Sequence, residues 1–64
     1  MDEGIINMQK IIVEISQDRL GKKISPLIIE KIKTKYLSYI GLEMIIDSVK
    51  SIEVENLEKY LDDL

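Results

Sequence analysis

The sequence contains no cysteine and no histidine among its 64 residues, and these absences exclude several kinds of chemistry. Without cysteine, the chain forms no disulfide and offers no thiolate to a metal ion or a substrate. Without histidine, it lacks the most common general base and a frequent ligand of zinc. The serine–histidine and cysteine–histidine pairs that activate a nucleophile therefore cannot form. We expect no enzymatic activity, no metal site and no cofactor.

Aromatic residues and chain breakers are also scarce, with no Phe or Trp, three Tyr, one Pro and three Gly. The stretch Gly21-Lys22-Lys23 has no second glycine nearby, so it does not match a glycine-rich phosphate loop. No apolar run approaches the roughly 18 residues that cross a bilayer. The first residues are acidic, whereas a secretory signal begins with basic residues. We expect a cytoplasmic protein that does not contact membranes.

The apolar residues that are present recur mainly at helical spacing. Ile5, Met8, Ile12 and Ile15 follow one another at intervals of three, four and three residues, which predicts a helix over about 3–20. This apolar stripe is wider than the stripe of about 100° on an ordinary surface helix. Other apolar residues widen it on both sides: Ile11 on one, and Ile6, Val13 and Leu20 on the other. The first helix is therefore expected to need neighbours on two sides.

The next helix has a clear start signal. Ser25 is a good N-cap residue, and Pro26 suits the first helical position. The apolar spacing then predicts a helix over about 26–40. Gly21 is placed to end the preceding helix in the left-handed conformation.

The role of Gly41 leaves two interpretations open. If the helix continued in phase, Glu43 would enter the apolar face, where an unpaired carboxylate is costly to bury. This argument favours a break at Gly41 and a short third helix over 42–50. The apolar residues of that helix are Leu42, Ile45, Ile46 and Val49. The alternative is one long helix in which Gly41 is a point of close contact.

A last helix is predicted over about 53–63, with Ser51 as a candidate cap. Its apolar residues are Val54, Leu57, Leu61 and Leu64, with Tyr60 beside them. The fold class is therefore all-α, a small three- or four-helix bundle. A chain of about 60 residues buries only about 60% of the surface that its unfolded form exposes. Because 45% of the residues are hydrophobic, we expect homo-oligomerisation to complete the bundle.

These features predict a non-enzymatic protein–protein interaction module, an oligomeric regulator, inhibitor or adaptor of a larger protein. The expected partners are a second copy of the chain and that larger protein. The expected interface residues are apolar and lie on the first and last helices: Ile5, Met8, Ile12, Ile15, Leu57, Tyr60, Leu61 and Leu64.

The charge distribution raises an alternative, a small dimeric nucleic-acid-binding regulator. Residues 21–42 carry five lysines against one acid, whereas residues 43–64 carry seven acids against two lysines. The lysines that would contact phosphates are Lys22, Lys23, Lys31 and Lys35. Against this function, the net charge is −3 and the basic segment has no arginine. The same lysines are also expected to meet the acidic segment 53–63.

Overall fold

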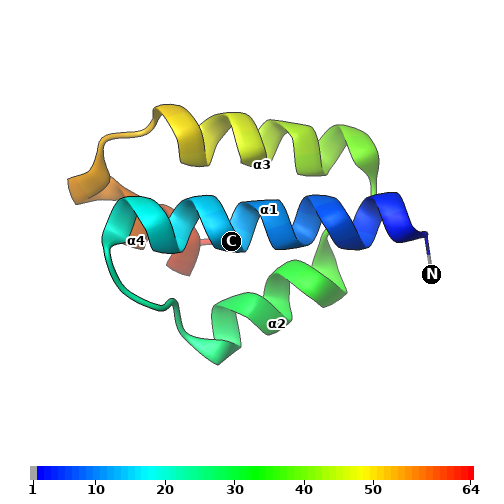
Figure 1. The fold of residues 1–64 in the computed structure, drawn as a ribbon, viewed down its shortest axis with the longest axis horizontal. Helices are drawn as coiled ribbons and strands as arrows, with labels where there is room; N and C mark the ends of the chain where they lie inside the picture. The colour runs from blue at the N-terminus through cyan, green and yellow to red at the C-terminus, as the bar shows by residue number, and fades with distance from the viewer. Residues whose placement is uncertain (1) are drawn as a thin grey trace.

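The computed structural model describes residues 2–64, which form four helices and no strand (Figure 1). The helices are α1 (Glu3–Leu20), α2 (Pro26–Lys35), α3 (Tyr39–Ser51) and α4 (Val54–Asp62). Figure 1 shows α2 and α3 on opposite sides of α1, with α1 and α3 running in the same direction. The last helix, α4, packs against α1 as well. The predicted all-helical fold is confirmed, and α1 has a neighbour on each side.

The turn between α1 and α2 follows the signals in the sequence. Gly21 has φ 70° and ψ 20°, and its N–H donates to the carbonyl of Gln17. Glycine adopts this left-handed conformation without the steric cost that a Cβ would add. The Ser25 side chain accepts a hydrogen bond from the N–H of Leu27, and Pro26 begins α2. The predicted end of α1 and start of α2 are both confirmed.

The predicted end of α2 is wrong, and the predicted break before a third helix is present but lies at residues 36–38 and not at Gly41. The helix ends at Lys35 rather than near residue 40, and Gly41 lies within the first turn of α3. Ser38 restarts the helix, because its hydroxyl accepts a hydrogen bond from the N–H of Gly41 at 3.1 Å. The chain therefore changes direction over residues 36–38, before Glu43 can enter the apolar face of α2.

A side chain from α1 stabilises this early end of α2. The amide of Gln9 donates to the carbonyls of Ile32, Lys33 and Tyr36, at 3.3, 3.4 and 2.9 Å. The last carbonyls of a helix have no partner within the helix, so a donor from elsewhere satisfies them. Gln9 is 4% exposed, so its side chain lies within the core and makes these hydrogen bonds away from solvent.

The last helix begins at Val54, close to the predicted start at about residue 53, but the predicted cap is wrong. Ser51 is the last residue of α3, and its hydroxyl donates to the carbonyl of Asp47 rather than capping α4. Glu53 occupies the N-cap position of α4 without a side-chain hydrogen bond to the helix. The leucines of α4 hold it in place instead, because Leu57 and Leu61 are fully buried.

The buried face of α1 is partly polar. Its buried residues are Ile5, Gln9, Ile12 and Ser16, whereas the predicted stripe paired Ile5 and Ile12 with Met8 and Ile15. Met8 and Ile15 are partly buried at the edge of the core. The centre of the buried face is therefore rotated slightly from the purely apolar stripe, toward Gln9 and Ser16.

Candidate protein-interaction surfaces

The eight residues predicted to form an oligomer interface lie in the core of a single chain or against it. Five of them are buried: Ile5, Ile12, Leu57, Leu61 and Leu64. The other three, Met8, Ile15 and Tyr60, are partly buried and pack against the core. The fold brings together the members of this set from α1 and α4 within one chain. Partner binding through them stays a prediction, and the apolar surface that the fold leaves open lies elsewhere.

Three of the four lysines considered for nucleic-acid contact lie along α4. Each of them binds an oxygen of α4 or of a residue that follows it. The ammonium of Lys22 lies 3.0 Å from the Glu58 carboxylate. Lys31 donates to the carbonyl of Asp62 and Lys35 to the carbonyl of Leu64, both at 2.7 Å. The expected contact between the basic centre and the acidic last segment is thus confirmed for Lys22 and Lys31. Lys23 is exposed.

Large apolar side chains remain exposed around the start of α3. They are Leu37, Tyr39, Ile40 and Met44, between 47% and 76% exposed. Ile40 and Met44 share one face of α3, and we name these two residues, together with the preceding Leu37, the α3 outer surface. The other exposed large apolar residues are Ile11, Leu27 and Val54, one on each of the other helices. Scattered single residues of this kind are normal on a protein surface, whereas a cluster often marks an interaction site.

The helix α3 is apolar on two faces. Leu42, Ile45 and Val49 point into the core, whereas Ile40 and Met44 lie one turn apart on the opposite face. The acids Glu43 and Asp47 are exposed beside these two residues. Lys22–Glu58 is the ion pair found within residues 2–64, so Glu43 and Asp47 do not form a salt bridge with a base in this part of the chain. The outer face of α3 therefore combines apolar side chains with two acids and, near the end of the helix, with the exposed Lys50.

Sequence reasoning missed this surface because it extended α2 too far. With a helix over 26–40, Tyr39 and Ile40 fall beside the apolar face of α2, which packs on the core. The restart at Ser38 changes the phase of the helix and turns Ile40 outward. Ser38, a good N-cap residue directly before a new run of apolar residues, was the signal that could have revealed the restart.

Tyr39 connects this surface to the start of α1. Its hydroxyl donates to the Asp2 carboxylate at 2.6 Å, and its ring lies over Gly4, where no side chain is in the way. This hydrogen bond, with a second one from the Gly4 N–H, lowers the pKa of Asp2 below its ordinary value. The same bond to Asp2 raises the pKa of Tyr39. The contact fixes the N-terminal ends of α1 and α3 side by side.

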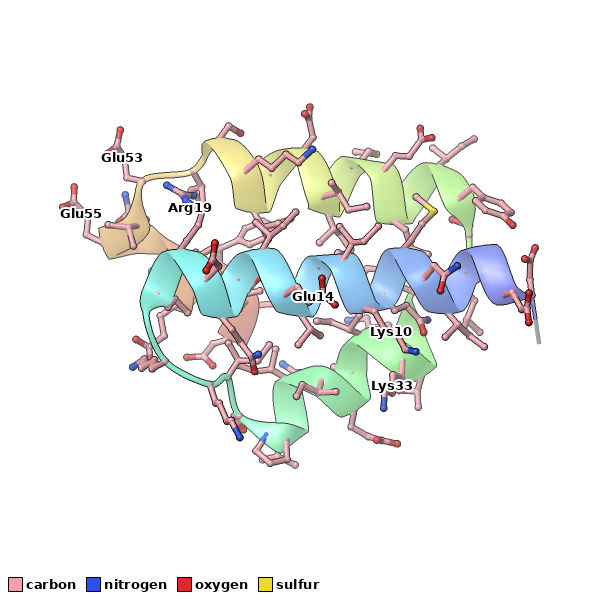
Figure 2. All side chains as sticks on the ribbon, viewed as in Figure 1. Lys10, Glu14, Arg19, Lys33, Glu53 and Glu55 are labelled. Carbon is pink, nitrogen blue, oxygen red and sulfur yellow. The ribbon has the colours of Figure 1, made fainter. Side chains whose placement is uncertain are left out.

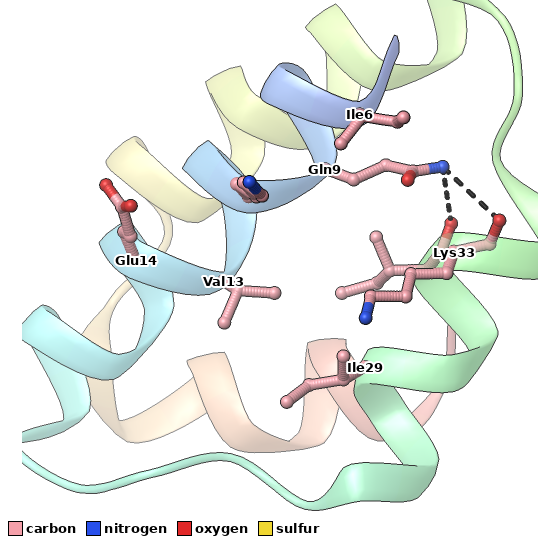
Figure 3. Close-up of a pocket in the computed structure, with 8 residues that line it drawn as sticks. Ile6, Gln9, Val13, Glu14, Ile29 and Lys33 are labelled. Carbon is pink, nitrogen blue, oxygen red and sulfur yellow. Dashed lines mark hydrogen bonds between the residues drawn. The ribbon is translucent and has the colours of Figure 1, made fainter. Parts of the chain in front are cut away.

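A groove of about 300 Å³ lies on the other side of α1, between α1 and α2 (Figure 3). Its lining residues are Ile6, Gln9, Lys10, Val13, Glu14, Ile29, Ile32 and Lys33. Figure 3 shows Ile6, Val13 and Ile29 around the opening, with Gln9 bonded to α2 at one end and Glu14 pointing away. Figure 2 shows Lys10 and Lys33 at its rim, on the same side of the molecule. We name this feature the α1–α2 groove.

Residues 2–64 bring together no group of three or more acidic side chains that could hold a metal ion. None of the helices described is both long enough and apolar enough to span a membrane. A comparison of this chain with known protein families, with curated proteins and with solved structures finds no match.

Proposed function

We propose that this chain is a non-enzymatic interaction module of the cytoplasm that binds another protein chain through the α3 outer surface. The observation that carries the proposal is the exposure of Ile40 and Met44, at 76% and 67%, on a helix whose opposite face is already packed. In binding, it would act as a regulator, inhibitor or adaptor of the chain that it contacts.

The energetics favour a protein partner for this surface. Burying a large aliphatic or Met side chain completely contributes about 1.5–3 kcal/mol. Ile40 and Met44 retain most of their surface for that purpose, and Leu37 retains about half. A few such residues at the centre of an interface supply most of its binding energy, and the neighbouring polar residues supply specificity.

The nucleic-acid alternative is not supported to the same degree. Lys22 and Lys31 bind oxygens of α4, and Lys35 binds the carbonyl of Leu64 after it, so each ammonium already has a partner in the same chain. A nucleic acid would have to compete with these contacts for the same ammonium groups.

Photo-crosslinking in the cells that make this protein tests the proposal. A photoreactive benzophenone residue is placed at Ile40 in one variant and at Leu27 in a matched control, because both side chains are 76% exposed and aliphatic. We expect a discrete adduct from position 40 and none from position 27, and mass spectrometry identifies the captured chain. Equal adducts from the two positions, or none from position 40, would overturn the proposal.

A further inference from the structure

The two open apolar features of this molecule have complementary chemistry. The α3 outer surface is exposed, and the charged residues nearest to it, Glu43 and Asp47, are acidic, while the exposed Lys50 lies farther along the same face of α3. The α1–α2 groove is concave and lined by aliphatic side chains, and Lys10 and Lys33 stand at its rim. Glu14 also borders the groove but points away from it (Figure 3). The molecule thus carries both an exposed apolar surface beside two acids and an apolar groove beside two lysines.

The dimensions are compatible as well. A volume of about 300 Å³ is at the lower end of the range of pockets that hold small ligands, and it accommodates one or two aliphatic side chains. Ile40 and Met44 are one helical turn apart, so they project from α3 side by side and enter a groove together. The groove runs between two helices, which is the shape that receives a helix face.

Electrostatics favour the groove over a symmetric contact between two α3 helices. In a symmetric contact, Glu43 and Asp47 of one copy would face the same acids of the other, and like charges at an interface are unfavourable. In the groove, the same acids would face Lys10 and Lys33, which are exposed and bear the opposite charge. The charge pattern therefore selects between two ways of covering the same apolar residues.

We infer that the occupant of the α1–α2 groove is the α3 outer surface of a second copy of this chain. The inference rests on the proposed function, since it names the partner of the same surface. The two contact regions lie on different sides of α1, because α2 and α3 flank that helix on opposite sides (Figure 1). One pair of copies cannot make both contacts at once, so the assembly grows head to tail into an open chain or a ring.

Sedimentation of the purified full-length chain over micromolar to millimolar concentration tests this assembly. The wild-type mass is expected to rise with concentration. A surface variant (Ile40→Ser with Met44→Ser) and a groove variant (Lys10→Glu with Lys33→Glu) are expected to stay monomeric. All four positions are exposed, so each variant keeps the core intact. The control variant Leu27→Ser changes an equally exposed residue outside both regions and is expected to assemble as the wild type does.

Mixing the two monomeric variants gives the decisive result. The surface variant keeps an intact groove and the groove variant keeps an intact surface, so an equimolar mixture forms one productive contact and stops at a heterodimer. A charge-reversed surface (Glu43→Lys with Asp47→Lys) is likewise expected to be monomeric alone. Mixed with the groove variant it regains both contacts, because its reversed surface meets the reversed groove and its intact groove receives the intact surface, so this mixture is expected to grow beyond a heterodimer. Growth beyond the heterodimer tests the proposed charges, whereas a mixture that stops at a heterodimer would contradict the charge pairing.

Several results would overturn the inference. A wild-type chain that stays monomeric at every concentration would exclude a second copy as the occupant. A dimer that the surface variant abolishes but the groove variant preserves would indicate the symmetric α3 contact instead. Mixtures that remain monomeric would exclude the head-to-tail arrangement. A monomeric chain that still forms an adduct with a different protein from position 40 would overturn only this inference and leave the proposed function standing.

Discussion

The two flanks of α1 are covered in different ways. On one flank, α3 runs alongside α1, and polar contacts join the two helices at both ends. Tyr39 binds Asp2 at one end, and at the other the guanidinium of Arg19 donates to the carbonyls of Val49 and Ile52. On the other flank, α2 is joined directly to α1 near one end only, through Gln9, and a groove remains between them.

This difference shows how a short chain can be well packed and still keep an open binding site. The α1–α3 flank holds the fully buried Leu42 and Val49, which lock the two helices together. The α1–α2 flank has aliphatic residues too, but lysines alternate with them at the rim, and their charged ends stay in water. Although Ile32 of α2 is also fully buried, we expect truncation of the partly exposed residues around the groove to lower the free energy of unfolding less than truncation of the residues buried between α1 and α3.

The largest expected effect comes from matched truncations of isoleucine on the two flanks. Ile45→Ala removes a 5% exposed side chain from α3 and should lower the free energy of unfolding by about 2–5 kcal/mol. Ile29→Ala truncates a half-buried side chain at the groove and should cost only about 1 kcal/mol. Urea denaturation followed by circular dichroism measures both. Equal losses would show that the two flanks are packed alike.

Gln9→Ala tests the single polar link between α1 and α2. It leaves the partly buried carbonyls of Lys33 and Tyr36 without their donor, which should cost about 1–3 kcal/mol. Amide hydrogen exchange should show faster exchange in the last turn of α2 and unchanged protection in α3. Uniform loss of protection over all four helices would contradict a local role for Gln9.

Ser16→Ala is expected to stabilise the protein. The Ser16 hydroxyl is fully buried and has no hydrogen-bond partner within residues 2–64. An unsatisfied buried hydroxyl costs free energy, so its removal should raise the free energy of unfolding by about 1 kcal/mol. Thermal unfolding measures the change, and Ser38→Ala serves as the contrasting variant, since the Ser38 hydroxyl caps α3 and its loss should destabilise. A lower melting temperature for Ser16→Ala would contradict this reading.

The smallest expected effect is at the Tyr39–Asp2 contact, which is exposed and depends on pH. Because the pKa of Asp2 is lowered by folding, the contact stabilises the fold above the ordinary carboxyl pKa, and this contribution is lost as pH falls through the lowered value. Because the pKa of Tyr39 is raised, the contribution is also lost as pH rises through that raised value.

Tyr39→Phe removes the hydroxyl and keeps the ring. The pKa of Asp2 should then rise toward its ordinary value, because the largest cause of its lowering is gone. NMR titration of the Asp2 carboxyl carbon measures this shift, with Tyr36→Phe as the control, since the Tyr36 hydroxyl donates to the carbonyl of Leu64 instead. An unchanged Asp2 pKa in Tyr39→Phe would show that the hydrogen bond does not form in solution.

The candidate binding surface was predicted less well than the fold. The excess of apolar residues correctly indicated that α1 needs neighbours on two sides, but both neighbours come from the same chain. The residues left exposed, Ile40 and Met44, have the same side-chain chemistry as those in the core. Composition and spacing do not distinguish them, since which face of α3 is covered depends on where that helix begins.

The amino-acid sequence alone determined the helical character, the turn at Gly21 and the start of α2 at Ser25 and Pro26, because caps and apolar spacing act over a few neighbouring residues. Only the tertiary structure decided where α2 ends and which apolar residues stay outside. The amide of Gln9 reaches the end of α2 from a helix more than twenty residues away in the chain, and no local pattern records that contact. The phase of α3, and with it the outward direction of Ile40, follows from this early end and from the cap at Ser38.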